Sequence, residues 1–298
     1  MIVTAQLALG PDSTLPAVEG AARGLEAAGV AAVCVLDAAD TGAVSPFEST
    51  TLCGRLASTT SEIGLVAAGS ALYGFPYHLA RRLATVDHFS DGRSGWMLRT
   101  GTATSEVSAY DWRSTLGRTA ELHRAAEYTE IALELWNSWE DGAQYPDKAT
   151  GDYKDDSRIH AIAYRSLAFR VEGPLDVPPS PQRRPVLLAE VGTAEEAAYL
   201  APVVDVALVP DAALAAAVQE GDPTTLVLLV LPADTPAAEA SRRCLDADAA
   251  GVSLECSTDT ADAAAALAAA FGATRGPGGT LAAALGLAET LTHGGRAA

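Results

Sequence analysis

The sequence predicts an α/β fold, a closed (β/α)8 barrel in which eight parallel strands alternate with eight helices. Eight short apolar runs rich in Val, Leu and Ile recur along the chain, and segments with helical spacing separate them. Short, continuously apolar runs are typical of strands buried on both faces of a parallel sheet. Their regular alternation with helices favours a barrel. A doubly wound open sheet is the competing fold, but no GxGxxG follows any of the runs.

The expected strands are the apolar runs themselves, at Ile2–Ala8, Ala31–Leu36, Ile63–Ala68, Gly95–Leu98, Val186–Val191, Val203–Val209, Leu226–Leu231 and Gly251–Cys256. The expected helices lie between and after them, at Leu15–Ala28, Pro46–Thr59, Pro76–Phe89, Leu116–Trp139, Ala194–Ala201, Ala212–Glu220, Pro236–Ala247 and Ala261–Phe271. Thr193 and Asp211 stand where N-cap residues belong, because their side chains can accept hydrogen bonds from first-turn N–H groups. Glycine, which tolerates the conformation that ends helices, marks helix ends at Gly29, Gly92, Gly221 and Gly272.

Two segments depart from the alternation. Residues 141–184 are polar and rich in proline, and we expect an insertion here, between the fourth and fifth strands. Its two short apolar runs predict one hairpin, formed by Ile159–Tyr164 and Leu167–Glu172. Residues 273–298 form a C-terminal tail with a last short helix at Leu281–Leu287. We therefore expect a single domain over residues 1–298.

Composition excludes several classes of partner. Lys and Arg number 20 against 38 Asp and Glu, a net charge of −18, which opposes binding to nucleic acid or to anionic lipid. No apolar stretch is long enough to span a membrane, and the first residues lack the basic region of a signal peptide. The four cysteines are widely spaced, and neither cysteines nor histidines have the spacing of a metal site. We expect a cytoplasmic protein that binds no metal.

One stretch carries a resemblance to a known family. SPFE from Ser45, LASTTSEIGL from Leu56 and PYHLARRLATVDHFSDGRSGW from Pro76 resemble the bacterial-luciferase-like flavin monooxygenases. Within that family they are most similar to the branch that acts on nitrilotriacetate, EDTA, long alkanes and dibenzothiophene sulfone. The similarity is strong from about residue 31 to 210 and weak from 211 to 272. Further matching segments lie at Ala126–Tyr128, Leu135–Glu140, Gly173–Gln182, Gly279–Leu281 and Leu285–Leu287.

The resemblance implies a barrel that uses reduced FMN and O2 on a small organic substrate, with the flavin supplied by a separate NAD(P)H-dependent reductase. The cofactor would carry the chemistry, while the protein orients the substrate and excludes water. The resemblance also implies a homodimer or a pairing with a paralogue, through the helices expected at Pro46–Thr59 and Pro76–Phe89. The substrate itself is not indicated by the sequence.

Candidate site residues follow from the rule that barrel active sites lie at the carboxyl ends of the strands. There, a carboxylate, hydroxyls and an arginine stand at the positions that the family uses for flavin. Gly192 and Thr193 open a helix whose N–H groups could hold a phosphate, and Arg99 could pair with a phosphate or with a nearby carboxylate. No catalytic residue is indicated, and the candidates for cofactor binding are Asp37, Ser70, Tyr73, Arg99, Thr100, Gly192 and Thr193.

Several polar positions depart from the family pattern. Met97 stands where the family has an amide, Arg118 and Leu122 replace its His and Tyr, and Glu190 adds a negative charge near the phosphate position. The Asp-His-x-Gly segment of the family is replaced by Ala163–Ser166 in this sequence. The chain is also much shorter than typical members of the family. Three interpretations therefore stay open: an FMN-dependent monooxygenase, a flavin-free barrel that serves as a non-catalytic binding or partner subunit, and a barrel using a deazaflavin whose anionic tail meets Arg99 or Arg118.

Overall fold

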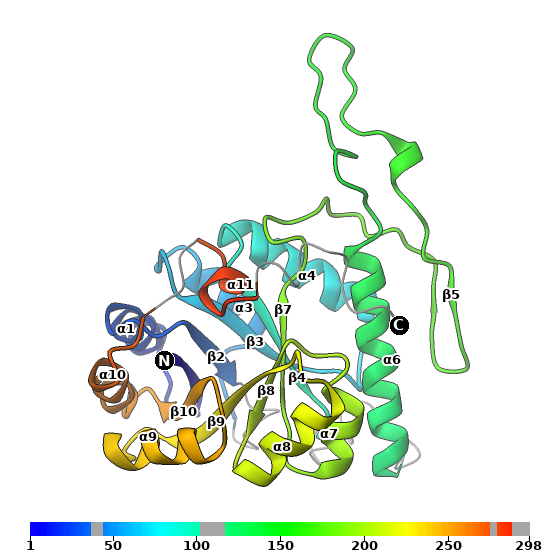
Figure 1. Cartoon of the computed structure of the whole chain (residues 1–298). Coiled ribbons are helices and arrows are strands. Elements are labelled where there is room, and N and C mark those ends of the chain that lie inside the picture. Colours follow the sequence, from blue (N-terminus) through cyan, green and yellow to red (C-terminus); the bar gives the residue numbers. More distant parts are fainter. Residues whose placement is uncertain (37–43, 102–116, 275–278, 288–298) are drawn as a thin grey trace.

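The computed structural model describes residues 1–36, 44–101, 117–274 and 279–287, and its centre is a closed barrel of parallel strands (Figure 1). The strands follow one another around the barrel in the order β1-β10-β9-β8-β7-β4-β3-β2. Their bounds are β1 Ile2–Ala8, β2 Ala32–Leu36, β3 Gly64–Ser70, β4 Ser94–Arg99, β7 Val186–Glu190, β8 Val206–Val209, β9 Leu226–Pro232 and β10 Gly251–Ser257. The predicted (β/α)8 fold and all eight predicted strands are confirmed.

Helices surround this barrel, and each predicted helix is present. Their bounds are α1 Leu15–Ala27, α3 Ser49–Leu56, α4 Pro76–Phe89, α6 Arg118–Trp136, α7 Ala194–Leu200, α8 Ala212–Gly221, α9 Ala237–Asp246 and α10 Ala261–Ala270. Helix α3 starts later than predicted because the Glu48 side chain accepts the Thr50 and Thr51 N–H groups at 3.2 and 2.8 Å. Thr193 and Asp211 cap α7 and α8 as expected, with hydrogen bonds of 3.1 and 3.0 Å.

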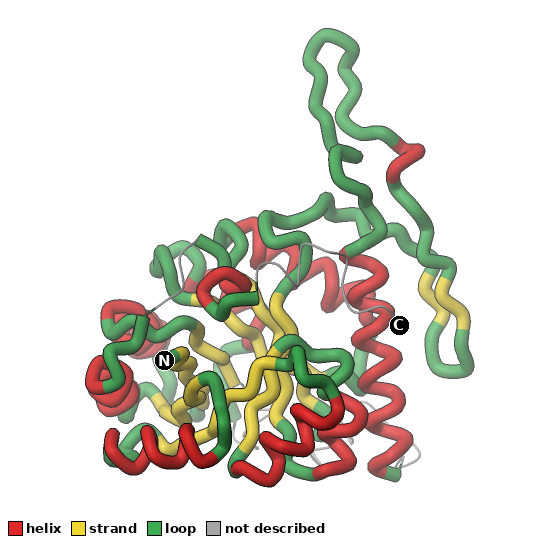
Figure 2. Tube along the Cα trace, viewed as in Figure 1, coloured by secondary structure: helices red, strands yellow, loops and turns green. Residues whose placement is uncertain are grey.

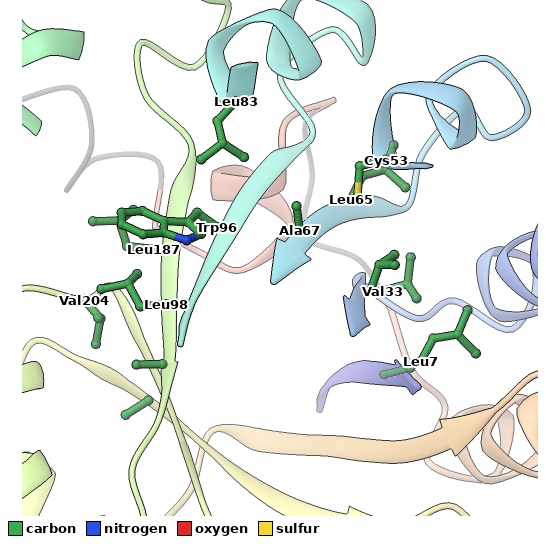
Figure 3. Close-up of a cluster of buried hydrophobic side chains, with 14 of the residues drawn as sticks. Leu7, Val33, Cys53, Leu65, Ala67, Leu83, Trp96, Leu98, Leu187 and Val204 are labelled. Atoms are coloured by element: carbon green, nitrogen blue, oxygen red, sulfur yellow. The ribbon is translucent and has the colours of Figure 1, made fainter. Parts of the chain in front are cut away.

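The hydrophobic core has two parts, one on each side of the barrel wall. Outward-facing side chains such as Leu65, Trp96 and Leu98 pack beneath the helices (Figure 3). Inward-facing side chains fill the barrel itself, among them Cys34 and Met97. Because β-strand side chains alternate between the two faces, Trp96 belongs to the outer core while Met97, the next residue, belongs to the inner one.

A short helix near the C-terminus, α11 (Leu281–Ala284), closes the amino end of the barrel (Figure 1). Leu281 is 1% exposed and lies against Gly64 and Gly95 at the starts of β3 and β4, where added Cβ atoms would meet its Cδ atoms. The predicted helix Leu281–Leu287 is thus present but shorter. Gln182 links α11 to α4, because its Oε1 accepts the Ala282 N–H at 3.3 Å and its Nε2 donates to Asp87 Oδ1 at 2.6 Å.

The insertion between β4 and β7 follows α6 and leaves the body of the barrel as a projecting arm (Figure 2). The arm folds back on itself, with the Tyr145 N–H donating to the Tyr153 carbonyl at 3.0 Å. Next comes the predicted hairpin, whose strands are shorter than expected: β5 Tyr164–Arg165 and β6 Arg170–Val171. A positive φ of 49° at Ala163 interrupts the first predicted strand. Phe169 anchors the hairpin to α6, because its ring packs against Tyr128 with centroids 5.8 Å apart.

Among the helices in the described ranges, none is long and apolar enough to cross a lipid bilayer.

Candidate functional site

The carboxyl ends of the strands form one face of the barrel, and the described candidate residues are all on loops or strand ends there. Ser70 ends β3, Arg99 ends β4, and Gly192 and Thr193 follow β7. Asp37 lies outside the described residues. A cavity of about 260 Å³ opens at the ends of β4 and β7, and Arg99, Thr100 and Gly192 line it. The other residues that line it are Leu98, Gly101, Arg118, Glu190 and Glu196.

Arg99 forms an ion pair with Glu190 across the ends of two neighbouring strands. The parallel pairing of β4 with β7, which places Leu98 opposite Ala189, brings these two strand-end residues together. One of the two partners expected for Arg99, a nearby carboxylate, is present as Glu190. The side chains of Arg99 and Glu190 are 22% and 40% exposed, so both face the solvent-accessible cavity.

Arg118, at the start of α6, contacts four acceptor groups around the cavity. Its guanidinium donates to the Thr100 carbonyl and, at 2.8 Å, to the Thr100 hydroxyl. It also pairs with Glu121 at 3.3 Å and with Glu196 of α7. Both terminal nitrogens of this guanidinium therefore already have acceptors from the protein itself.

The predicted phosphate cradle before α7 is occupied by the protein's own groups. The Gly192 N–H donates to Glu196 Oε2 at 2.7 Å, and the Thr193 hydroxyl accepts the Glu196 N–H at 3.1 Å. Sequence reasoning missed Glu196, although a signal was available. Thr193 and Glu196 have the S/T-x-x-E spacing of a capping box, in which the carboxylate turns back over the start of its helix.

Ser70 and Tyr73 do not line the cavity. The Ser70 hydroxyl accepts the Leu72 N–H at 3.1 Å, within the turn after β3. Tyr73 is 6% exposed and packs in the outer hydrophobic core. The structure thus brings Arg99, Thr100 and Gly192 together at the cavity, whereas Ser70 and Tyr73 lie outside its lining.

The described residues supply no evident nucleophile or metal centre. Cys34 faces the barrel interior, and burial, followed by the negative charge of Glu190, raises the pKa of its thiol. A thiol in such surroundings stays protonated and unreactive. Within the described ranges, no group of three or more His, Cys, Asp or Glu residues is placed to hold a metal ion.

The residues around the cavity do not fit a flavin phosphate. A phosphate monoester carries nearly two negative charges at neutral pH and needs donors that are not already compensated. Here Arg99 is paired with Glu190, Arg118 with Glu121 and Glu196, and the Gly192 N–H with Glu196. Among the described residues, two guanidinium groups thus face three carboxylates, so their summed charge is negative and opposes a phosphate.

Comparison with known proteins places the chain in a family. Residues 2–272 match the model of the luciferase-like monooxygenases, and the chain belongs to this family. It is 38% identical over 230 residues to one subunit of pristinamycin IIA synthase of Streptomyces pristinaespiralis, covering 77% of this chain and 74% of that protein. A second subunit of the same synthase matches as well, with 31% identity over 142 residues, 48% of this chain and 29% of that protein.

The branch named by the sequence resemblance is also supported. Dibenzothiophene-sulfone monooxygenase of Rhodococcus erythropolis is 38% identical over 147 residues, 49% of this chain but only 32% of that enzyme. Among solved structures, a riboflavin lyase crystallised with modified FMN and riboflavin has a TM-score of 0.83 at 18% identity, with 96% of each chain covered. At that level of identity the likeness shows the fold alone.

Proposed function

We propose that this chain is one subunit of a flavin-dependent monooxygenase, in which a luciferase-like partner subunit holds the reduced FMN and this barrel does not. The observation that carries the proposal is the charge pairing at the barrel mouth. Each described guanidinium there, on Arg99 and on Arg118, is compensated by a carboxylate of the same chain. The family assigns the chain to monooxygenases, and the charge pairing supports a role other than oxygen activation.

Two further observations support pairing with another chain. The relative that this chain matches over most of both lengths is named as one subunit of a synthase, and a second subunit of that synthase matches it too. In addition, helix α4, which the resemblance implies in pairing, exposes an aromatic side chain at each end. Phe75 is 69% and Phe89 66% exposed, and exposed aromatics are enriched at protein interfaces. The reaction of the complex would use O2, a small organic substrate and a separate flavin reductase in the cytoplasm.

An anaerobic calorimetric titration of the purified chain with reduced FMN, with oxidised FMN as a parallel titration, tests this proposal. We expect no saturable binding of either form at micromolar flavin, from a protein whose melting curve shows that it is folded. Saturable micromolar binding of reduced FMN to the chain alone would contradict the proposal.

That outcome would support the second candidate, an FMN-dependent monooxygenase that acts without a flavin-binding partner. Its support is membership of the family and an open cavity at the carboxyl ends of the strands, the location of barrel active sites. A deazaflavin cofactor meets the same objection as FMN, because its anionic tail would also face Glu190 and Glu196. Replacing Asp37 by alanine would then test that residue, since it should weaken flavin affinity with little change in melting temperature.

A further inference from the structure

We infer that Glu196 is the residue that closes the cavity to anions, so that the cavity admits only an uncharged or positively charged group of a ligand. The inference rests on the proposed function, because it names the carboxylate that blocks a flavin phosphate most directly in this barrel. Glu196 bridges two donors that an anion would otherwise use. One carboxylate oxygen pairs with Arg118, and the other accepts the Gly192 N–H at 2.7 Å.

The Glu196 carboxylate is fixed in this bridging position. Its own backbone N–H is capped by the Thr193 hydroxyl at 3.1 Å, and its side chain is only 15% exposed. Arg118 is fixed as well, because Thr100 accepts from its guanidinium through both the carbonyl and the hydroxyl. An incoming anion would therefore have to displace a carboxylate that is held at two points, by the Arg118 guanidinium and by the Gly192 N–H.

The remaining charges of the cavity have the same effect. Glu190 compensates Arg99, and Glu121 lies 3.3 Å from Arg118 as a second carboxylate on that guanidinium. Hydrogen bonds between a charged donor and a charged acceptor are among the strongest that a protein makes. Only an anion competes with the carboxylates for these guanidinium groups, so a ligand without negative charge leaves the pairs intact. The carboxylate of Glu190, 40% exposed in its side chain, can accept a hydrogen bond from such a ligand.

Two flavins that differ only in a phosphate, riboflavin and FMN, test the inference as an affinity ratio. Dissociation constants for both are measured by fluorescence quenching with the natural chain, Glu196→Ala, Glu196→Gln and the matched control Glu195→Ala. Glu195 is the adjacent carboxylate on α7 and bonds to the Thr119 hydroxyl at 2.6 Å, outside the cavity lining. The natural chain should show no preference for FMN. Glu196→Ala should shift the ratio toward FMN by about tenfold or more, since one charge-assisted contact is gained, and Glu195→Ala should leave it unchanged.

Inorganic phosphate serves as a second probe that needs no flavin binding. Against a sodium chloride control of equal ionic strength, phosphate should raise the melting temperature of Glu196→Ala but not that of the natural chain. Glu196→Gln, which keeps the side-chain size, replaces Glu196→Ala if the alanine variant does not fold. A preference of the natural chain for FMN, or Glu196 variants that gain neither FMN preference nor phosphate stabilisation, would overturn the inference. Micromolar binding of reduced FMN that riboflavin matches would instead contradict only the proposed function.

Discussion

Shortening Leu281 to alanine should lower the free energy of unfolding by about 3 kcal/mol. Leu281 is 1% exposed at the amino end of the barrel. Removing its three terminal side-chain carbons loses about 2 to 2.5 kcal/mol at roughly 0.8 kcal/mol for each buried carbon. The cavity left behind adds the remainder, because the closed ring of strands around it cannot collapse onto the space. Urea unfolding followed by far-ultraviolet circular dichroism measures this change.

A double-mutant cycle with Gly64 shows whether the loss arises from this contact. Gly64→Ala would place a Cβ against Leu281 Cδ1 and 3.1 Å from the Ala31 carbonyl, so it should cost about 1 to 3 kcal/mol through overpacking. Leu281→Ala removes the colliding carbon. The double variant should therefore lose less than the sum of the two single losses, by at least about 1 kcal/mol.

Gly24→Ala is the matched control for this cycle, because Gly24 lies on α1 with no heavy atom within 4 Å of its added Cβ. Combined with Leu281→Ala it should be additive to within about 0.5 kcal/mol. Additive losses for Gly64→Ala and Leu281→Ala, or a loss below about 1 kcal/mol for Leu281→Ala alone, would refute the conclusion that α11 closes the barrel.

Three other predictions concern stability. Asp205→Ala should lower the free energy of unfolding in urea by about 3 to 5 kcal/mol, because it leaves the buried Arg184 side chain, 6% exposed, without its carboxylate partner. The control Asp176→Ala removes an exposed ion pair and should lower it by less than about 1 kcal/mol. Equal losses would contradict this. Burial raises the pKa of Asp87, so the folded state binds its proton more tightly, and the stability that Asp87 contributes falls as the pH rises through that raised pKa. The natural chain should therefore lose stability relative to Asp87→Asn as the pH rises above about 4, and a stability difference that grows in favour of the natural chain would contradict the prediction. Replacing residues 145–153 by an Asn-Gly turn should change the melting temperature by less than about 3 °C, because the Gln144–Lys154 bridge can close the shortened hairpin; a large drop would show that the arm supports the barrel.

The strands could be predicted from sequence because their burial leaves a direct mark in it. Strand β1 can be predicted to the residue, because five of its seven residues are apolar and the strands of a parallel barrel are buried on both faces. Helix α4 was also predicted to the residue, between a proline at its first turn and the glycine Gly92. The start of α3 could not be predicted from the sequence. It depends on whether the Glu48 side chain accepts hydrogen bonds from the Thr50 and Thr51 N–H groups or points into solvent.

The site could be predicted in position but not in its pairing. Arg99 ends β4 and Gly192 follows β7, and the parallel register brings these strand ends together, so the sequence is sufficient to place both residues at one cavity. Which carboxylate each arginine pairs with could not be predicted from the sequence. Arg118 and Glu196 are 78 residues apart and meet only because α6 packs beside α7. Whether an arginine meets a ligand or a carboxylate depends on such contacts.

Core packing and the charged contacts at the barrel mouth depend on different residues of the same strands. Strand β4 contains residues of both kinds, core residues and a charged residue of the cavity, within four positions. Trp96 and Leu98 face outward into the core beneath the helices, whereas Met97 and Arg99 face inward, toward the barrel interior and its mouth. Trp96 lies in the stretch that resembles the family and packs in the outer core. The chemistry depends instead on Arg99 and its neighbours, which can change without cost to the core. Among the described residues, both guanidinium groups at the barrel mouth pair with carboxylates of the same chain, so the charges there and the packing of the core are separate features of this chain.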